Sequence, residues 1–381
     1  MLGERPAVEP EAFPASKVHL LPDALRWEDV SRGRFDPVFD DYVSLVGNTL
    51  HRALDDDRTP EDGFVGNLAA KLRSVPSPDF LRVALSPCFT SRLLWQPATS
   101  ARGALEFLDR ALHVEAVISG RERADCDAWT ALGDVKVLRS GEILRGVGVP
   151  GLPPLDFDGP NITDDLPTGG ADPARFGSLS GAVRPTVIDR ITVAWEEITA
   201  TSEAVADFVA KFVQVIVPRC DTARTRFSSG SYRQYIGRVV IGNPHAAGAG
   251  HVAHAEALVH EAIHALLYMA LYPVSWGVRD PRAYRPGERV VSPWTGAHLQ
   301  LSSYLQACFV WYGLVHFWDL ARQGETFGDG DRARCRRDRA LGGFVGPPLL
   351  DLLGSDNRAL IRADVVDAVE SIQDRVLSRF G

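Results

Sequence analysis

Ala255–Tyr268 reads AEALVHEAIHALLY and contains His260-Glu261-Ala262-Ile263-His264, an HExxH pattern within a run of good helix formers. Residues four apart lie one above the other on a helix, so His260 and His264 can offer two imidazole nitrogens to one cation. Glu261 lies beside them and can act on a metal-bound water or orient the ligands. Two imidazoles on an otherwise apolar helix would be costly to bury without partners. The stretch therefore predicts a metal site with Glu261 as its catalytic residue.

The composition is that of a globular protein with a sizeable core. The chain has 381 residues, of which 45% are hydrophobic and 24% are charged, which suits one or two domains. The net charge of −8 argues against nonspecific binding to nucleic acid or to anionic membranes. Five scattered cysteines without a CxxC pair favour reduced thiols. No apolar signal-peptide core and no bilayer-spanning run occurs, so we expect a cytoplasmic protein.

The patterning predicts an α+β protein that is mostly helical. Residues 1–150 are expected to form a mainly helical N-terminal region, and residues 186–381 a domain that carries the metal site. Between them, residues 151–185 are dense in Pro, Gly, Asp and Thr, which is typical of a linker or a long surface loop. Apolar spacing predicts N-terminal helices over residues 35–54, 63–75, 78–94 (broken at Ser86-Pro87) and 104–118.

The second half is expected to place a small sheet beside the HExxH helix. The pattern predicts, in order, a strand over 187–198, a helix over 202–217, a turn cluster over 227–232, a strand over 236–241, the HExxH helix, and helices over 299–320, 340–353 and 364–380. A strand just ahead of the metal helix is typical of zincin folds, in which the strand edge can hold an extended peptide.

Two histidines do not complete a metal site, so a third ligand is expected downstream. His298 follows a turn at the head of the next helix and can swing towards the metal. Gln306 is an alternative, as a polar group within an apolar helix, and His316 and Asp319 are further candidates. Because His316 has Val315 and Phe317 as its neighbours, it is more typical of a packed core residue. The spacing leaves these alternatives open.

Three arginines lie between the two helices that can carry metal ligands. Arg279, Arg282 and Arg285 can bind a carboxylate in bidentate fashion, either that of a small co-substrate or that of a peptide. The alternative is an ordinary solvated loop.

The chain also resembles a known family. Four segments carry the resemblance: SSGSYRQYIGRVVIGNP at 228–244, HAEALVHEAIHALL at 254–267, SPW at 292–294 and LQACFVWYGLVHFW at 305–318. Together they are similar to the HExxH-motif proteins that mature ribosomally made peptides. Members of that family are thought to be α-ketoglutarate-dependent iron oxygenases that β-hydroxylate residues of a precursor peptide.

The resemblance implies an activity and a set of site residues. It implies a cytoplasmic Fe(II)/α-ketoglutarate dioxygenase, with His260 and His264 as iron ligands and Glu261 at or beside the metal. The expected partners are a precursor peptide and the small-molecule co-substrate. The expected co-substrate site consists of Arg279, Arg282, Arg285, Ser292 and Trp294. The HExxH pattern alone slightly favours a zinc metallopeptidase with Glu261 as general base, whereas the wider resemblance favours the hydroxylase. A metal-stabilised binding module without catalysis is the third alternative.

Overall fold

The computed structural model describes residues 17–28, 33–56, 63–95, 101–163, 176–271, 277–278, 289–328 and 330–381. The chain divides into two compact units. The first unit consists of residues 1–42, 194–209 and 258–381, and the second of residues 43–193 and 210–257. Each unit takes residues from both sides of the predicted 151–185 linker.

Helices make up much of the second unit. They are α2 (Asp36–Asp56, whose first residues belong to the first unit), α3 (Phe64–Ser74), α4 (Ser77–Ala84), α5 (Pro87–Trp95), α6 (Ala101–Ile118) and α7 (Pro160–Thr163). The predicted N-terminal helices are confirmed, including the break before α5, where Pro87 occupies the first helical position. A three-stranded antiparallel sheet follows α6, with β1 (Ala128–Trp129), β2 (Val135–Val137) and β3 (Ile143–Arg145).

A four-stranded sheet forms the rest of the second unit. Its order is β4 (Phe176–Gly177), β5 (Val215–Asp221), β7 (Tyr235–Gly242) and β6 (Ser228–Tyr232), with β5 and β7 parallel. Every residue of β7 is buried, which confirms the strand predicted over 236–241. The turn predicted over 227–232 is wrong, because Ser228–Tyr232 pairs with β7 as an edge strand.

Two further predictions in this part of the chain are wrong. The strand predicted over 187–198 lies within helix α8 (Arg184–Thr201), and the helix predicted over 202–217 is shorter, as α9 (Glu203–Phe212). In α8 the fully buried residues Val187, Ile191, Ala194 and Ile198 follow one another at intervals of three and four, which is the spacing of one helical face. The β-branched residues suggested a strand, but this spacing decides the structure.

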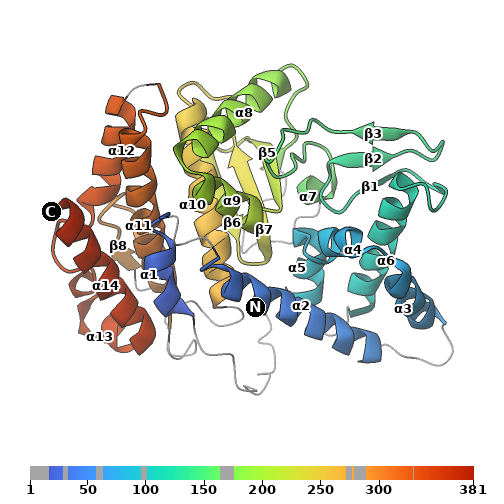
Figure 1. The fold of residues 1–381 in the computed structure, drawn as a ribbon, viewed down its shortest axis with the longest axis horizontal. Helices are drawn as coiled ribbons and strands as arrows, with labels where there is room; N and C mark the ends of the chain where they lie inside the picture. Colours follow the sequence, from blue (N-terminus) through green and yellow to red (C-terminus); the bar gives the residue numbers. More distant parts are fainter. Residues whose placement is uncertain are drawn as a thin grey trace. The chain divides into compact units, whose positions relative to one another are not determined.

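The first unit is built around α11 (Leu301–Gln323), which is buried along nearly its whole length. Helix α12 (Gly330–Gly342) and helix α14 (Ala363–Phe380) pack against it and lie beside it in Figure 1. The unit also contains η1 (Val18–Leu20), α1 (Leu21–Ala24), the hairpin of β8 (Arg289–Val291) and β9 (His298–Gln300), η5 (Asp351–Leu353) and α13 (Gly354–Ala359). Helix α10 (His251–Ala270) enters this unit at Leu258.

The helices predicted over 299–320 and 364–380 are confirmed as α11 and α14. The helix predicted over 340–353 is wrong, because α12 ends at Gly342 and the chain then turns through Gly343 and Pro347-Pro348. Adjacent glycines and adjacent prolines are both poor helix formers, which accounts for this end.

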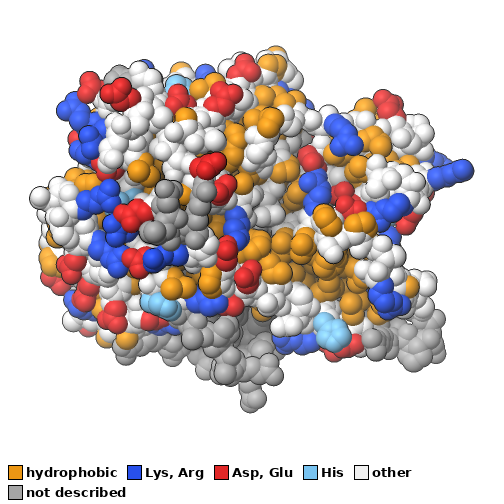
Figure 2. Space-filling view, viewed as in Figure 1, with side chains coloured by type: hydrophobic (Ala, Val, Ile, Leu, Met, Phe, Trp, Pro, Cys, Tyr) orange, Lys and Arg blue, Asp and Glu red, His pale blue; other side chains and the backbone are white. Residues whose placement is uncertain are grey.

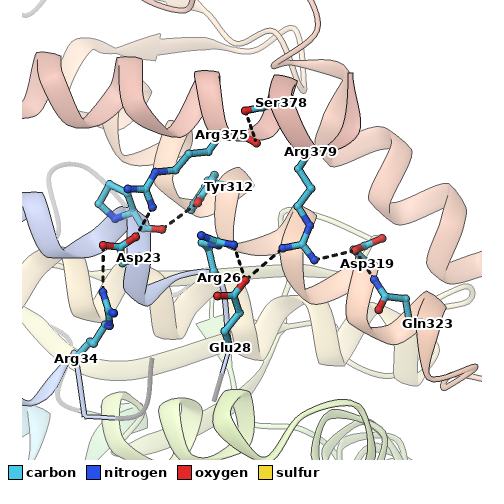
Figure 3. A network of polar contacts seen from close by, with 11 residues as sticks. Asp23, Arg26, Glu28, Arg34, Tyr312, Asp319, Gln323, Arg375, Ser378 and Arg379 are labelled. Carbon is cyan, nitrogen blue, oxygen red and sulfur yellow. Dashed lines mark hydrogen bonds and ion pairs between the residues drawn. The ribbon is translucent and has the colours of Figure 1, made fainter. Parts of the chain in front are cut away.

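A polar network ties the N-terminal part of the first unit to α11 and α14 (Figure 3). Tyr312 donates a hydrogen bond to the carbonyl of Pro22 at 2.9 Å, and Arg375 pairs with Asp23. Arg379 reaches both Glu28 and the buried Asp319, at 3.5 and 3.6 Å. Because these bonds join residues far apart in sequence, they help to fix α14 beside α11.

The helices and small sheets together confirm a mixed α+β fold, whereas the zincin-like arrangement around the HExxH helix stays a prediction. In the described residues no helix has both the length and the apolar character of a membrane span. Acidic and basic side chains are interspersed over the face drawn in Figure 2.

Gly313 allows α11 to approach its neighbours closely. A Cβ at this position would lie 2.7 Å from Ile263 Cδ1 and 3.2 Å from the Trp27 ring, while Trp27 Nε1 donates to the Gly313 carbonyl at 2.8 Å. We expect Gly313→Val to lower the free energy of unfolding by about 1–3 kcal/mol through overpacking, measured by urea denaturation.

The matched control is Gly47→Ala in α2, where an added Cβ meets nothing within 4 Å. We expect it to raise stability by about 0.5–1 kcal/mol, since alanine is the better helix former. A Gly313→Val protein as stable as the wild type would contradict the close packing of α11.

Candidate metal centre

The HExxH residues lie on α10, a mostly buried helix with one narrow strip of partly exposed side chains. The predicted helix is confirmed and most of its side chains are buried. Its partly exposed positions include Ala253, Glu256, His260, His264 and Tyr268. Their intervals of three or four residues place them along one face of the helix. The two histidines therefore lie on the least buried face of the helix.

The structure brings His260, Glu261 and His264 together as a group of three metal-binding side chains. One donor atom from each lies within 4.8 Å of the others, and the two imidazole rings are 5.0 Å apart. Two ligands bound at about 2.1 Å and at tetrahedral angles are about 3.4 Å apart, so the donor atoms would have to approach one another by up to about 1.4 Å to bind one ion. Helix geometry alone supplies this arrangement.

The electrostatics of the group suit a cation. Burial lowers the pKa of His260 to about 4, an effect that the carboxylate of Glu261 opposes and the charge of His264 reinforces. At neutral pH the His260 ring is therefore uncharged and its lone pair is available, which is the form that metals bind. The carboxylate of Glu261 is only 3% exposed, and a bound cation would neutralise its charge. The residues present fit a divalent transition metal.

Gln306 orients His264 from the neighbouring helix. His264 Nδ1 lies 2.9 Å from the side-chain oxygen of Gln306 in α11, and Gln306 itself is 7% exposed. An amide oxygen can only accept, so Nδ1 carries the proton and Nε2 keeps the lone pair that a metal needs. Partners of this kind fix the ring orientation of metal-binding histidines. The geometry thus favours an orienting role over the ligand role that the sequence suggested as an alternative for Gln306.

His298, the first choice for a third ligand, lies outside the group. It occupies β9, where its side chain is exposed and its carbonyl accepts a hydrogen bond from Arg289. Among the residues that the structure describes, the group has no member besides the three HExxH residues. Glu261 is therefore the described residue best placed as the third ligand.

The other sequence candidates serve the packing of the fold. His316 is buried against Tyr312 and Phe380, as a core histidine. Asp319 accepts hydrogen bonds from Arg322 and Gln323 (Figure 3 shows the latter). Neither belongs to the metal group.

The residues predicted to bind the co-substrate divide into two sets. Arg279, Arg282 and Arg285 lie outside the described residues. The buried Ser292 accepts a hydrogen bond from the Thr295 amide in a turn, and Trp294 donates to the carbonyl of Ala340. These contacts give both residues a local structural role.

Sequence reasoning missed the aromatic side chains that flank the histidines. Tyr268 is stacked on His264 with ring centres 5.9 Å apart, and Trp311 of α11 meets His260 edge-on at 6.4 Å. Trp294 in turn stacks on Trp311 at 5.9 Å. The four-residue interval from His264 to Tyr268 was a signal in the sequence, whereas nothing local connects Trp311 with His260.

A scan against models of known protein families gives no match, and no curated protein matches the chain. The resemblance to the peptide-maturation family therefore stays a prediction.

Replacing Gln306 tests its orienting role. We expect Gln306→Leu to weaken metal binding by about tenfold to a hundredfold, because His264 loses the partner that fixes its tautomer. Titration with Fe(II) under anaerobic conditions, or with Zn(II), measures the affinity. Gln300→Leu, at an exposed position just before α11, should leave it unchanged. If Gln306→Leu lost metal binding as completely as His264→Ala does, Gln306 would instead be a direct ligand.

The lowered pKa values of three buried histidines predict that the folded protein loses stability in mild acid. Burial lowers the pKa of His254 to about 4 and that of His316 to about 3, as it does for His260. The unfolded chain takes up these protons near pH 6.5, whereas the folded chain does not. Stability is therefore fully present above about pH 6.5 and falls as the pH drops towards 4, by up to about 1.4 kcal/mol per pH unit for each histidine.

The test is the free energy of unfolding in urea between pH 4 and 8, for the wild type and for His316→Phe. The variant should lose about 1.4 kcal/mol per pH unit less than the wild type below pH 6, and the two curves should run parallel above pH 7. If the two curves ran parallel at every pH, His316 would not contribute to the pH dependence of the free energy of unfolding.

Proposed function

We propose that this protein is an Fe(II)- and α-ketoglutarate-dependent enzyme that hydroxylates a side chain of a ribosomally made precursor peptide. One observation carries the proposal: the described metal group consists of two histidines and one carboxylate, His260, His264 and Glu261. Two histidines and a carboxylate with further positions open are the ligand set typical of non-haem Fe(II) oxygenases. The peptide substrate follows from the sequence resemblance.

The chain's own residues would hold the metal and keep its surroundings dry. His260, His264 and Glu261 would occupy one side of the ion and leave the other side to co-substrate and peptide. Bound iron would supply the oxidation of a C–H bond to C–OH by O2, with α-ketoglutarate oxidised to succinate and CO2. Trp311 is 6% exposed, and together with Tyr268 it would restrict water beside the two imidazoles.

A zinc metallopeptidase is the second candidate, because the position of Glu261 is also compatible with it. The carboxylate lies within 4.8 Å of both histidine donors, which also suits a general base acting on zinc-bound water. The two functions differ in what Glu261 does: in the oxygenase it binds the metal, and in the peptidase it takes a proton from water.

Glu261→Gln separates the two functions. If Glu261 is a ligand, we expect iron affinity and hydroxylation to fall together, because an amide is a weaker ligand than a carboxylate. If Glu261 is a general base, zinc affinity should persist while peptide cleavage is lost. The control is Glu256→Gln, which changes a carboxylate on the same strip of α10 but outside the metal group.

The assay is mass spectrometry of the precursor peptide encoded beside this chain's own coding sequence. The wild type, reconstituted anaerobically with iron and then given O2, should add one oxygen atom to the peptide only when α-ketoglutarate is present. Cleavage with zinc alone would replace the proposal by the peptidase, and metal binding without either reaction would leave a metal-stabilised binding module.

A further inference from the structure

Arg339 places a positive charge against Trp311, which packs beside the candidate metal ligand His260. It lies in the last turn of α12, with its side chain exposed and its guanidinium carbon 5.3 Å from the centre of the Trp311 ring. The same ring meets His260 edge-on. A cation over an indole face is held by the quadrupole of the ring, which limits the directions the side chain can take.

The other arginines of α12 for which the structure gives ion pairs are engaged with carboxylates. Arg334 pairs with Asp331 at 2.8 Å, and Arg337 pairs with Asp338 at 2.8 Å and with Asp319 at 3.5 Å. Within the described part of the chain, no carboxylate oxygen lies within ion-pair distance of Arg339. The side chain is exposed, and its guanidinium carries five N–H donors with which it can bind an anion.

The net positive charge at the centre could be balanced by an anion that carries two negative groups. A divalent ion held by Glu261 and two neutral histidines carries one net positive charge, and Arg339 adds a second. A ligand with one metal-binding end and one distant carboxylate would neutralise both charges.

We propose that Arg339 binds a carboxylate of the molecule that occupies the metal centre, with Trp311 supporting the guanidinium from one face. The inference rests on the proposed function. The ligand class is a carboxylate that Arg339 can hold through two parallel N–H···O bonds. It belongs either to the keto acid or to an acidic side chain of the peptide, and the two arms of the test separate these sources.

The first arm compares α-ketoglutarate with α-ketobutyrate, which has the same metal-binding end but no second carboxylate. Binding to the iron-loaded protein without O2 is followed by the visible charge-transfer absorption of the keto acid complex. We expect the wild type to prefer α-ketoglutarate and Arg339→Ala to lose that preference by about tenfold to a hundredfold. Arg339→Lys should keep part of the preference for α-ketoglutarate. The control variant Arg334→Ala should keep the whole of it.

The second arm adds an acetylated Ala-Asp-Ala or Ala-Asn-Ala amide to the iron–keto acid complex and follows the same absorption. A preference for the Asp peptide that Arg339→Ala removes would assign the carboxylate to the peptide. Unchanged iron affinity and circular dichroism would show that the variant is folded. If Arg339→Ala keeps the wild-type preferences in both arms, the inference is overturned and the proposed function stands. If the wild type binds iron but no keto acid, the proposed function fails and the inference fails with it.

Discussion

The burial of α10 and α11 is the constraint on which the metal centre depends. Both helices are buried along most of their length, and a polar group placed there has to be paired or it destabilises the fold. The hydrogen bond between His264 and Gln306 joins the two helices and satisfies both side chains at once. Close approach at Gly313 brings α11 to Ile263, one residue before His264. The same packing that builds the core therefore positions His264, a candidate metal ligand.

The parts that could be predicted from the sequence are those that depend on short-range geometry. His260 and His264 come together because a helix brings residues four apart onto one face, so five consecutive residues suffice to predict the group. The N-terminal helices are equally local, since their apolar spacing and the Ser86-Pro87 break are visible in the sequence. For these elements the local preference and the final fold agree.

The parts that could not be predicted depend on contacts between distant segments. Ser228–Tyr232 has the composition of a turn but forms a strand, because β7 offers it a hydrogen-bonding edge. His298 looked suitable as a ligand from its distance along the chain, but the hairpin of β8 and β9 leaves its side chain exposed. Trp311 of α11 meets His260, and Arg339 of α12 lies over Trp311; no pattern near either residue indicates these contacts.

The orientation of Glu261 supports its assignment as a ligand. A general base has to reach water, whereas a ligand has to reach the ion. Glu261 is 3% exposed, whereas His260 and His264 are both partly exposed, so Glu261 is the most buried residue of the three. A buried carboxylate could neutralise part of the charge of an ion held by the two rings. Trp311 and Tyr268 pack against the two imidazole rings, and Arg339 lies over Trp311; under the proposed function these side chains would favour an organic anion as a further ligand.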